Sequence, residues 1–348
     1  MKEYLPERII IEVHQPIGSF YLGKFTPKEL HLIANKDLSR YQDIEKGIQR
    51  DISPERIKEI KDYVKQPSAT FPNSIIIAVG YDDNLEPNWE FNNMTNVIKI
   101  RKGQNVANVI DGQHRLAGLS NEDESFELPV AIFLGVPWIE QGIIFATINN
   151  NQRKVNQSLV YELYGMSKER RVQTVAYRIV SLLNEQEESP WYQKIKMLGK
   201  AKNDGDLSQG AFSKYLHEKI LDSGKPLHYL YQEEKDAVVF KLLFNYFTAI
   251  KKIFPVVWEN KDKEYILTKT TGFVGFMLFF GDLIKLAKDS HESMTVDYFE
   301  RKIKGSSADF LLFNNDNYKS GGVGQMKIRD TLRGGLTSEE KIKLNITK

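Results

Sequence analysis

The stretch NVANVIDGQHRLAGLS, Asn105 to Ser120, joins an apolar run to a helical pattern through one tight turn. The apolar run ends at Asp111 and Gly112, and Arg115 follows almost one helical turn later. An apolar run bounded by a turn is typical of a buried strand, and a glycine permits a positive φ angle or a close backbone approach. We therefore predict a strand, a tight turn and a helix in direct succession.

A turn of this kind favours anion binding. The first N–H groups of a helix have no partner within the helix and carry partial positive charge. Arg115 can add a bidentate contact to phosphate, and His114 can donate to phosphate or shuttle a proton. Asp111 can cap the helix, hold a metal ion on the phosphates or orient a water molecule. The same residues also fit an ordinary solvated turn, which the pattern alone favours because Asp-Gly is common in turns.

The pattern on either side of this turn predicts an α+β fold. Residues 8–26 indicate one or two strands, followed by short helices that begin after the N-caps Thr26 and Ser53. The runs NSIIIAVGYD and ELPVAIFLGV indicate buried strands, and we expect residues 96–110 to form a hairpin that turns at Lys102 and Gly103. From Trp138 onward nearly every long segment has helical periodicity. We predict an α+β domain over residues 1–165 and a mostly helical domain over residues 166–348.

Composition excludes several classes of protein. The 348 residues carry a net charge of only +2, so a nucleic-acid surface must be a local patch. The absence of cysteine excludes disulfides, thiolate catalysis and cysteine-ligated zinc, and no two histidines have zinc-ligand spacing, so we predict no protein-ligated metal site. The N-terminus shows no signal-peptide pattern, and we interpret GFVGFMLFFGDLI as a buried core helix. These features predict a cytoplasmic protein without a membrane partner.

The exact string VIDGQHRLAGL resembles the signature of the DGQHR-domain family, which includes the DndB-like proteins of DNA phosphorothioation systems. Upstream, IQRDISPERIKEIKDYVKQPSATFPNSIIIAV resembles that family's Gln-Arg, helix, Phe-Pro, strand pattern. Downstream, FATINNNQRKVNQSLVYELYG resembles its IN…V…VYEL segment. The three motifs span roughly residues 45–165 in the same order.

The resemblance extends to the wider ParB and sulfiredoxin-like superfamily, in which a strand–turn–helix motif ending in arginine binds a nucleoside triphosphate. It implies an ATP or other NTP ligand, with or without Mg²⁺. The residues that it implies for binding the nucleotide are Gln49, Arg50, Gly112, Gln113 and Arg115, and we add the amides of Asn149 and Asn150, which suit base or sugar edges.

The GmrSD-type restriction nucleases are a related branch that carries DGQQR, so His114 replaces a glutamine here. If the turn is hydrolytic, we expect Asp111 and His114 to be its catalytic residues. The C-terminal half shows no His-Asn-His nuclease signature, which argues against a self-contained nuclease.

Two basic segments are candidates for DNA binding. Arg171 and Arg178 are one heptad apart, so one helical face is basic. Lys327, Arg329 and Arg333 follow a glycine-rich stretch within the last 48 residues, which hold 10 Lys or Arg against 5 Asp or Glu. A solvated helix face and a plain surface loop are the alternatives.

Two functions stay open on the sequence. The first is a DndB-like, DNA-binding accessory or regulatory protein of a DNA modification or phage-defence system, which acts in transcription regulation and uses a nucleotide as ligand or switch. The second is an NTP hydrolase that assists DNA modification or restriction. Both imply DNA, a nucleotide and other proteins of a DNA modification system as partners.

Overall fold

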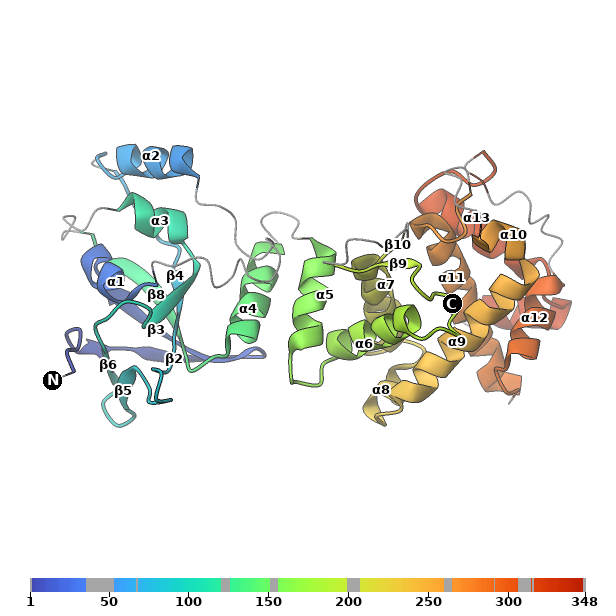
Figure 1. Cartoon of the computed structure of the whole chain (residues 1–348), viewed down its shortest axis with the longest axis horizontal. Coiled ribbons are helices and arrows are strands. Elements are labelled where there is room, and N and C mark those ends of the chain that lie inside the picture. Colours follow the sequence, from blue (N-terminus) through green and yellow to red (C-terminus); the bar gives the residue numbers. More distant parts are fainter. Residues whose placement is uncertain are drawn as a thin grey trace. The chain divides into compact units, whose positions relative to one another are not determined.

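The computed structural model describes residues 2–35, 53–66, 68–119, 126–150, 156–198, 207–259, 265–290, 292–305, 314 and 316–346. The chain divides into two compact units, residues 1–155 and 156–348, and each is described by itself (Figure 1). The sequence placed the boundary at residue 165. The helix that contains Gly165 packs against the helices that follow it, so the division falls before this helix.

The first unit mixes strands and helices. Its elements are β1 Arg8–Ile9, β2 Ile11–Gln15, β3 Gly18–Phe25, α1 Pro27–Ile33, α2 Pro54–Tyr63, β4 Ile75–Val79, β5 Trp89–Asn92, β6 Val97–Ile100, β7 Ala107–Asp111, α3 Gln113–Gly118, β8 Leu128–Leu134 and α4 Trp138–Asn150. Thr26 caps α1 in a capping box with Glu29, and Ser53 caps α2, as the sequence predicted.

A five-stranded sheet in the order β2-β3-β8-β4-β7 forms the frame of this unit. Strands β4 and β8 are parallel, and the other neighbours are antiparallel. Alternate residues of β4 bury on opposite faces: Ile75 and Ile77 belong to one hydrophobic cluster, and Ala78 belongs to another that includes Ile144 of α4. Because both faces are covered, the central strands are continuously apolar in sequence.

The hairpin predicted at Lys102 and Gly103 is wrong. Strand β6 lies in a separate three-stranded sheet in the order β1-β6-β5, whereas β7 pairs with β4. The segment between them passes from one sheet to the other, with Gly103 at φ +156°. The buried strand β4 is the antiparallel neighbour of β7. The local sequence between β6 and β7 does not show that β4, rather than β6, pairs with β7.

The second unit is mostly helical. Its elements are α5 Gln157–Met166, α6 Val172–Glu185, β9 Ile195–Lys196, β10 Leu207–Ser208, α7 Gln209–Tyr215, the π-helix η2 Leu216–Leu221, α8 His228–Gln232, α9 Asp236–Ile253, α10 Pro255–Glu259, α11 Thr270–Ser290, α12 Val296–Lys304, α13 Gly322–Arg333 and α14 Ser338–Ile346. The chain as a whole is therefore a mixed α+β protein, with its strands concentrated in the first unit.

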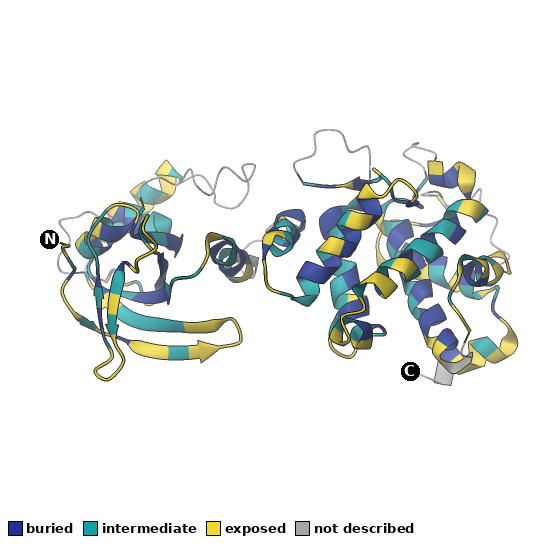
Figure 2. Cartoon of the chain, turned by 60° about the horizontal axis from the view of Figure 1, so that its bottom comes forward, coloured by how far each residue is buried: buried dark blue, intermediate teal, exposed yellow. Residues whose placement is uncertain are grey.

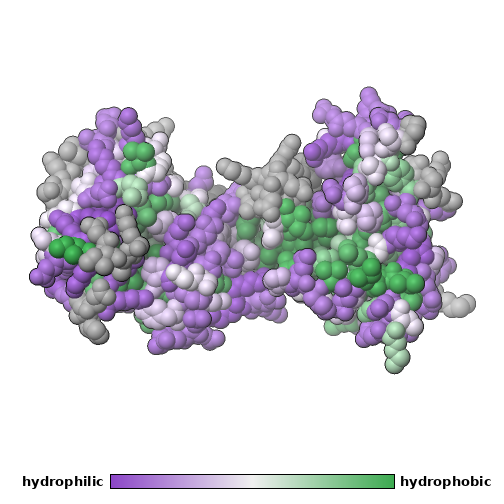
Figure 3. Space-filling view, turned by 180° about the vertical axis from the view of Figure 1, so that it is seen from behind, coloured by the Kyte–Doolittle hydropathy of each residue, from purple (hydrophilic) through white to green (hydrophobic). Residues whose placement is uncertain are grey.

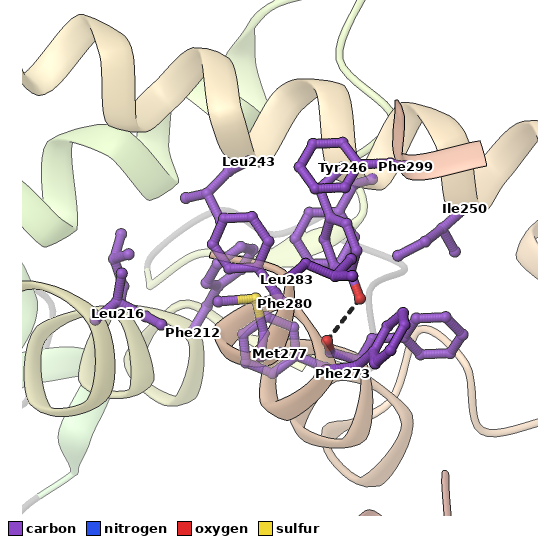
Figure 4. Close-up of a cluster of buried hydrophobic side chains, with 14 of the residues drawn as sticks. Phe212, Leu216, Leu243, Tyr246, Ile250, Phe273, Met277, Phe280, Leu283 and Phe299 are labelled. Carbon is purple, nitrogen blue, oxygen red and sulfur yellow. Dashed lines mark hydrogen bonds between the residues drawn. The ribbon is translucent and has the colours of Figure 1, made fainter. Parts of the chain in front are cut away.

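Helices α9 and α11 supply the centre of the second unit's core. Aromatic side chains meet between them, and Tyr246 donates a 2.6 Å hydrogen bond to the carbonyl oxygen of Phe276 (Figure 4). Helix α11 is long and apolar enough to cross a membrane by length and composition, but 67% of its most apolar window is buried inside the unit. It is the buried core helix that the sequence predicted.

Candidate functional site at the DGQHR turn

The DGQHR turn lies where β7 ends and α3 begins. Gly112 adopts φ +94° at the N-cap of α3, and a Cβ atom there would lie 3.0 Å from Ile75 Cγ1 and 3.0 Å from Arg115 Nη2. Both the backbone conformation and the space therefore require glycine, as the sequence indicated. The Gly112 carbonyl oxygen accepts the first helical hydrogen bond of α3, from Leu116 N–H at 2.9 Å, so the helix begins directly after the strand.

Arg115 fastens the turn to the start of β4. Its Nη1 donates to the Asn73 carbonyl oxygen, and its Nη2 donates to the Ser74 carbonyl oxygen at 3.0 Å and to Asp111 Oδ2 at 3.2 Å. The side chains of Arg115 and Asp111 are 18% and 30% exposed, so this ion pair is shielded on most sides. The guanidinium thus connects three acceptors from two separate parts of the chain, the adjacent carbonyl groups of Asn73 and Ser74 and the carboxylate of Asp111.

His114 links the turn to helix α2. Its Nε2 accepts a 3.1 Å hydrogen bond from the backbone N–H of Ser53, the N-cap of α2, so Nε2 carries no proton in this arrangement. Ile60 of α2 packs directly on Gly118 of α3, where an added Cβ would lie 2.4 Å from Ile60 Cγ2. The motif therefore joins β4, α2 and α3 into one assembly.

The remaining motif side chain is also used within the domain. Gln113 donates from Nε2 to the Val109 carbonyl oxygen at 3.0 Å. A triphosphate would need the Arg115 guanidinium to face it, but this group donates to two carbonyl oxygens and a carboxylate. The contacts of Gln113 and Arg115 therefore fit a structural role, in which these side chains hold the turn to its neighbours, better than a phosphate-binding role. Nucleotide binding by Gly112, Gln113 and Arg115 stays a prediction.

Four predicted nucleotide contacts cannot be placed. Gln49 and Arg50 lie outside the described residues. Asn149 and Asn150 form the end of α4, but only their backbone is described. The predicted convergence of these residues on the turn is therefore untested.

Arg171 directly precedes α6, and Arg178 lies within that helix. Arg171 is the N-cap residue of this helix and pairs with Glu169, and its side chain is 26% exposed. Arg178 is exposed and donates a 3.4 Å hydrogen bond to the Ser167 carbonyl oxygen. Both guanidinium groups therefore contact the segment between α5 and α6, Arg171 through Glu169 and Arg178 through Ser167.

Arg329 and Arg333 do not lie in a surface loop, which the sequence left open as the alternative to a DNA-binding segment. Both lie on α13 and donate from Nε and Nη2 to the two carboxylate oxygens of Asp282, at 2.7–2.8 Å. The Asp282 side chain is only 4% exposed. Burial by itself would raise the pKa of Asp282, but the hydrogen bonds and charges of Arg329 and Arg333 outweigh burial and hold that pKa below its ordinary value.

Lys327 remains at the surface of α13. Its Nζ donates to the Asn317 carbonyl oxygen at 2.9 Å and lies 5.4 Å from the centre of the Tyr318 ring. The three basic residues predicted to bind DNA together thus divide into one surface lysine and two arginines committed to a buried carboxylate. DNA binding by this set stays a prediction, and two of its members have a structural role.

A family model described as DndB, DNA-sulfur modification-associated, matches residues 11–272. The chain belongs to the DndB family. Membership ties this protein to a DNA phosphorothioation system, as the resemblance implied. No curated protein and no solved structure matches the chain.

The DndB match covers most of the first unit, including the DGQHR turn, and continues to the start of α11. Asp282, Arg329 and Arg333 lie beyond it. The role of Asp282 was not predicted from the sequence, although one signal was present: a single carboxylate lies inside the apolar run GFMLFFGDLIKLA. A lone acid on a buried helix face predicts a cationic partner, because an unpaired buried charge is costly.

The His114 contact gives a testable prediction for this DndB-family turn. We expect His114→Ala to leave the Ser53 N–H without its acceptor and to cost about 1–2 kcal/mol of local stability, which raises amide exchange in α2 about tenfold or more. His114→Gln should preserve slow exchange, because the glutamine carbonyl oxygen can accept the same bond. Exchange measured by mass spectrometry on α2 peptides checks this, and equal exchange in the alanine variant and the wild type would contradict it.

Proposed function

We propose that this protein is a DNA-binding regulatory component of its DNA phosphorothioation system, as DndB-family membership suggests. In this proposal the DGQHR turn braces the first unit, and cationic side chains of the second unit contact the DNA backbone. The relationship of the first unit to the ParB and sulfiredoxin-like domains, the role in transcription regulation and phage defence, and contacts with other proteins of the system are parts of the same proposal.

The observation that carries the DNA proposal is the charge around the start of α6. Lys168 and Arg178 are exposed, and Arg171 is partly exposed beside Glu169. Arg170 does not belong to this set, because it pairs with Asp236 at 2.7 Å and lies 4.4 Å from the centre of the Tyr231 ring. Three cations against one acid over so short a stretch supply the local positive patch that a nearly neutral chain needs to hold phosphates.

The patch can be tested by salt dependence. Replacing both Lys168 and Arg178 by alanine should weaken duplex binding and reduce the slope of log affinity against log salt by up to about 1.8, since each lost phosphate contact contributes about 0.9. A filter-binding titration of the full chain measures the slope, with duplexes that carry or lack phosphorothioate linkages. Both side chains are at the surface, so the fold should be retained.

A matched control is Lys251→Ala, which removes a partly exposed lysine that already pairs with Glu259 at 3.1 Å. Its slope should equal that of the wild type. Lys327→Ala tests the C-terminal segment separately, with an expected slope change of about 0.9. A wild-type slope in the Lys168 and Arg178 double variant would remove this patch from the proposal, and no duplex binding at low salt would remove the proposal itself.

NTP hydrolysis is the second candidate function. One observation supports it: Asp111 and His114 occupy the same turn, and the Asp111 side chain is 30% exposed. Against it, Asp111 pairs with Arg115, and His114 Nε2 already accepts the Ser53 N–H. Steady-state turnover of each common nucleoside triphosphate, with Mg²⁺ and with or without DNA, tests this candidate. Turnover that Asp111→Asn abolishes would favour the hydrolase over the regulator.

A further inference from the structure

The outer edge of strand β2 is the feature that the proposed function does not use. Strand β2 ends the five-stranded sheet, and no strand among the described residues pairs with its other side. The opposite end of the sheet differs, because Ala34 bridges to Ala107 of β7 and Asn35 N–H donates to the Ala107 carbonyl oxygen. An open edge presents a row of backbone donors and acceptors that another strand can pair with.

This edge has little protection against pairing. Natural edge strands carry charged side chains, proline or a bulge, whereas the five residues of β2 are Ile-Glu-Val-His-Gln in regular register with β3, with Glu12 as the one acidic residue and no lysine, proline or bulge. Ile11 is 66% exposed and Ile17, in the adjoining turn, is 43% exposed. Figure 2 draws β2 largely as exposed, and on the face that Figure 3 shows, the first unit carries both hydrophobic and hydrophilic residues at its surface.

We propose that β2 pairs antiparallel with β2 of a second copy of this chain, around a two-fold axis at Val13. In this register each Glu12 lies opposite His14 of the other copy, so two pairs of complementary groups form on one face. On the other face Val13 then lies opposite Val13, and the exposed Ile11 lies opposite Gln15 and diagonal to Val13 of the other copy.

Charge selects this register over its neighbours. An axis at Glu12 would place two carboxylates directly opposite each other, which destabilises pairing. An axis at His14 would place the two imidazoles opposite each other and would leave each Glu12 without an imidazole partner. Within one copy, Glu12 lies 3.9 Å from His14 Nδ1, and that Nδ1 is 2.7 Å from Ser19 Oγ. The Nε2 side of the ring is therefore the side directed to a partner carboxylate.

A pairing of five residues is small, so we expect a concentration-dependent dimer rather than an obligate one. The inference is independent of the DNA proposal, because it concerns the first unit alone and needs no ligand. The other occupant of such an edge would be an extended peptide of a different protein. That alternative would leave the isolated chain monomeric at all concentrations.

Cross-linking tests the register directly. The chain has no cysteine, so Val13→Cys places a single thiol at the proposed axis, where Cβ atoms of opposite residues lie about 4.5–5.5 Å apart. Under mild oxidation this variant should form a disulfide-linked dimer several-fold faster than the control Met94→Cys, although Met94 is 98% exposed. Equal rates for the two variants would overturn the proposal.

Exchanging the charges tests the pairing of Glu12 with His14 in a chain that carries no added cysteine. Glu12→Lys or His14→Glu alone should weaken dimerisation about tenfold in sedimentation experiments, because the first removes the carboxylate that lies opposite His14 and the second places two carboxylates opposite each other. The double variant with both changes restores opposite charges and should recover most of the affinity. A dimer that all three variants leave unchanged would show that the copies associate through another surface, and the proposal would fail.

Discussion

Replacing Asp282 by asparagine should remove about 3–5 kcal/mol of stability from the second unit, the usual cost of breaking a buried charge pair. The carboxylate is 4% exposed and accepts four hydrogen bonds from Arg329 and Arg333. Asparagine keeps the shape but has one acceptor and no charge, so two guanidinium groups would face each other without a counterion. Amide exchange of α11 and α13, measured segment by segment, reports the loss.

Asp330→Asn is the matched control for this prediction. Asp330 lies on the same helix, next to Arg329 in sequence, but is exposed, so its replacement should change the same exchange free energies by less than about 0.5 kcal/mol. If Asp282→Asn has an equally small effect, the cluster does not hold α13 on α11. DNA measurements on Arg329 or Arg333 variants then need the same exchange control, because loss of binding can follow from loss of fold.

The Asp282 cluster also predicts a pH dependence. Its pKa in the folded unit lies below the ordinary value of about 3.9, so the native state binds the proton less readily than the unfolded chain does. The stabilisation is therefore fully present above about pH 4 and is lost as pH falls through the folded pKa. Acid titration of unit 2 should show this step in the wild type, and Asp282→Asn should lack it.

Replacing Arg115 by alanine should destabilise the first unit by about 3 kcal/mol. The guanidinium donates to the carbonyl oxygens of Asn73 and Ser74 and pairs with Asp111, and charge-assisted bonds of this kind contribute about 1.5–3 kcal/mol each. Exchange should rise in β4, whose first residue follows Ser74 directly, and in α3. Exchange in the second unit should not change.

Arg115→Lys separates the brace from a nucleotide contact. Lysine keeps the positive charge for a phosphate, but its single amine cannot reproduce the fork that reaches two carbonyl oxygens and a carboxylate. If the brace dominates, the lysine variant is nearly as unstable as the alanine variant, and calorimetry finds no triphosphate binding in the wild type. Triphosphate binding that the lysine variant retains would instead assign Arg115 to the nucleotide.

Several local features followed from the sequence because short-range chemistry fixes them. Thr26 and Ser53 were identified as N-caps because their side chains satisfy helix N–H groups a few residues away. Gly112 was identified as a special backbone position because only glycine readily takes its φ angle. The apolar runs of β4 and β8 indicated strands, and the structure buries both faces of these strands.

Other features depended on partners that local patterns cannot name. Local sequence suggested that β6 and β7 pair with each other, but β6 pairs with β1 in one sheet and β7 pairs with β4 in another. The sequence also could not show that His114 contacts Ser53, 61 residues away, or that Arg115 turns to Asn73 rather than to solvent. In each case the choice among several possible partners depends on tertiary packing.

The sequence by itself thus determined the DndB-family membership, the strand–turn–helix at DGQHR and the helical character of the second unit, because these rest on periodicity, caps and an ordered set of motifs. Only the tertiary structure decided what the charged side chains do. The sequence indicated that Arg329 and Arg333 are surface cations, whereas in the folded unit both pair with the buried Asp282. A charge is assigned to solvent, ligand or core by the burial and geometry of its neighbours, and these come from segments far apart in the chain.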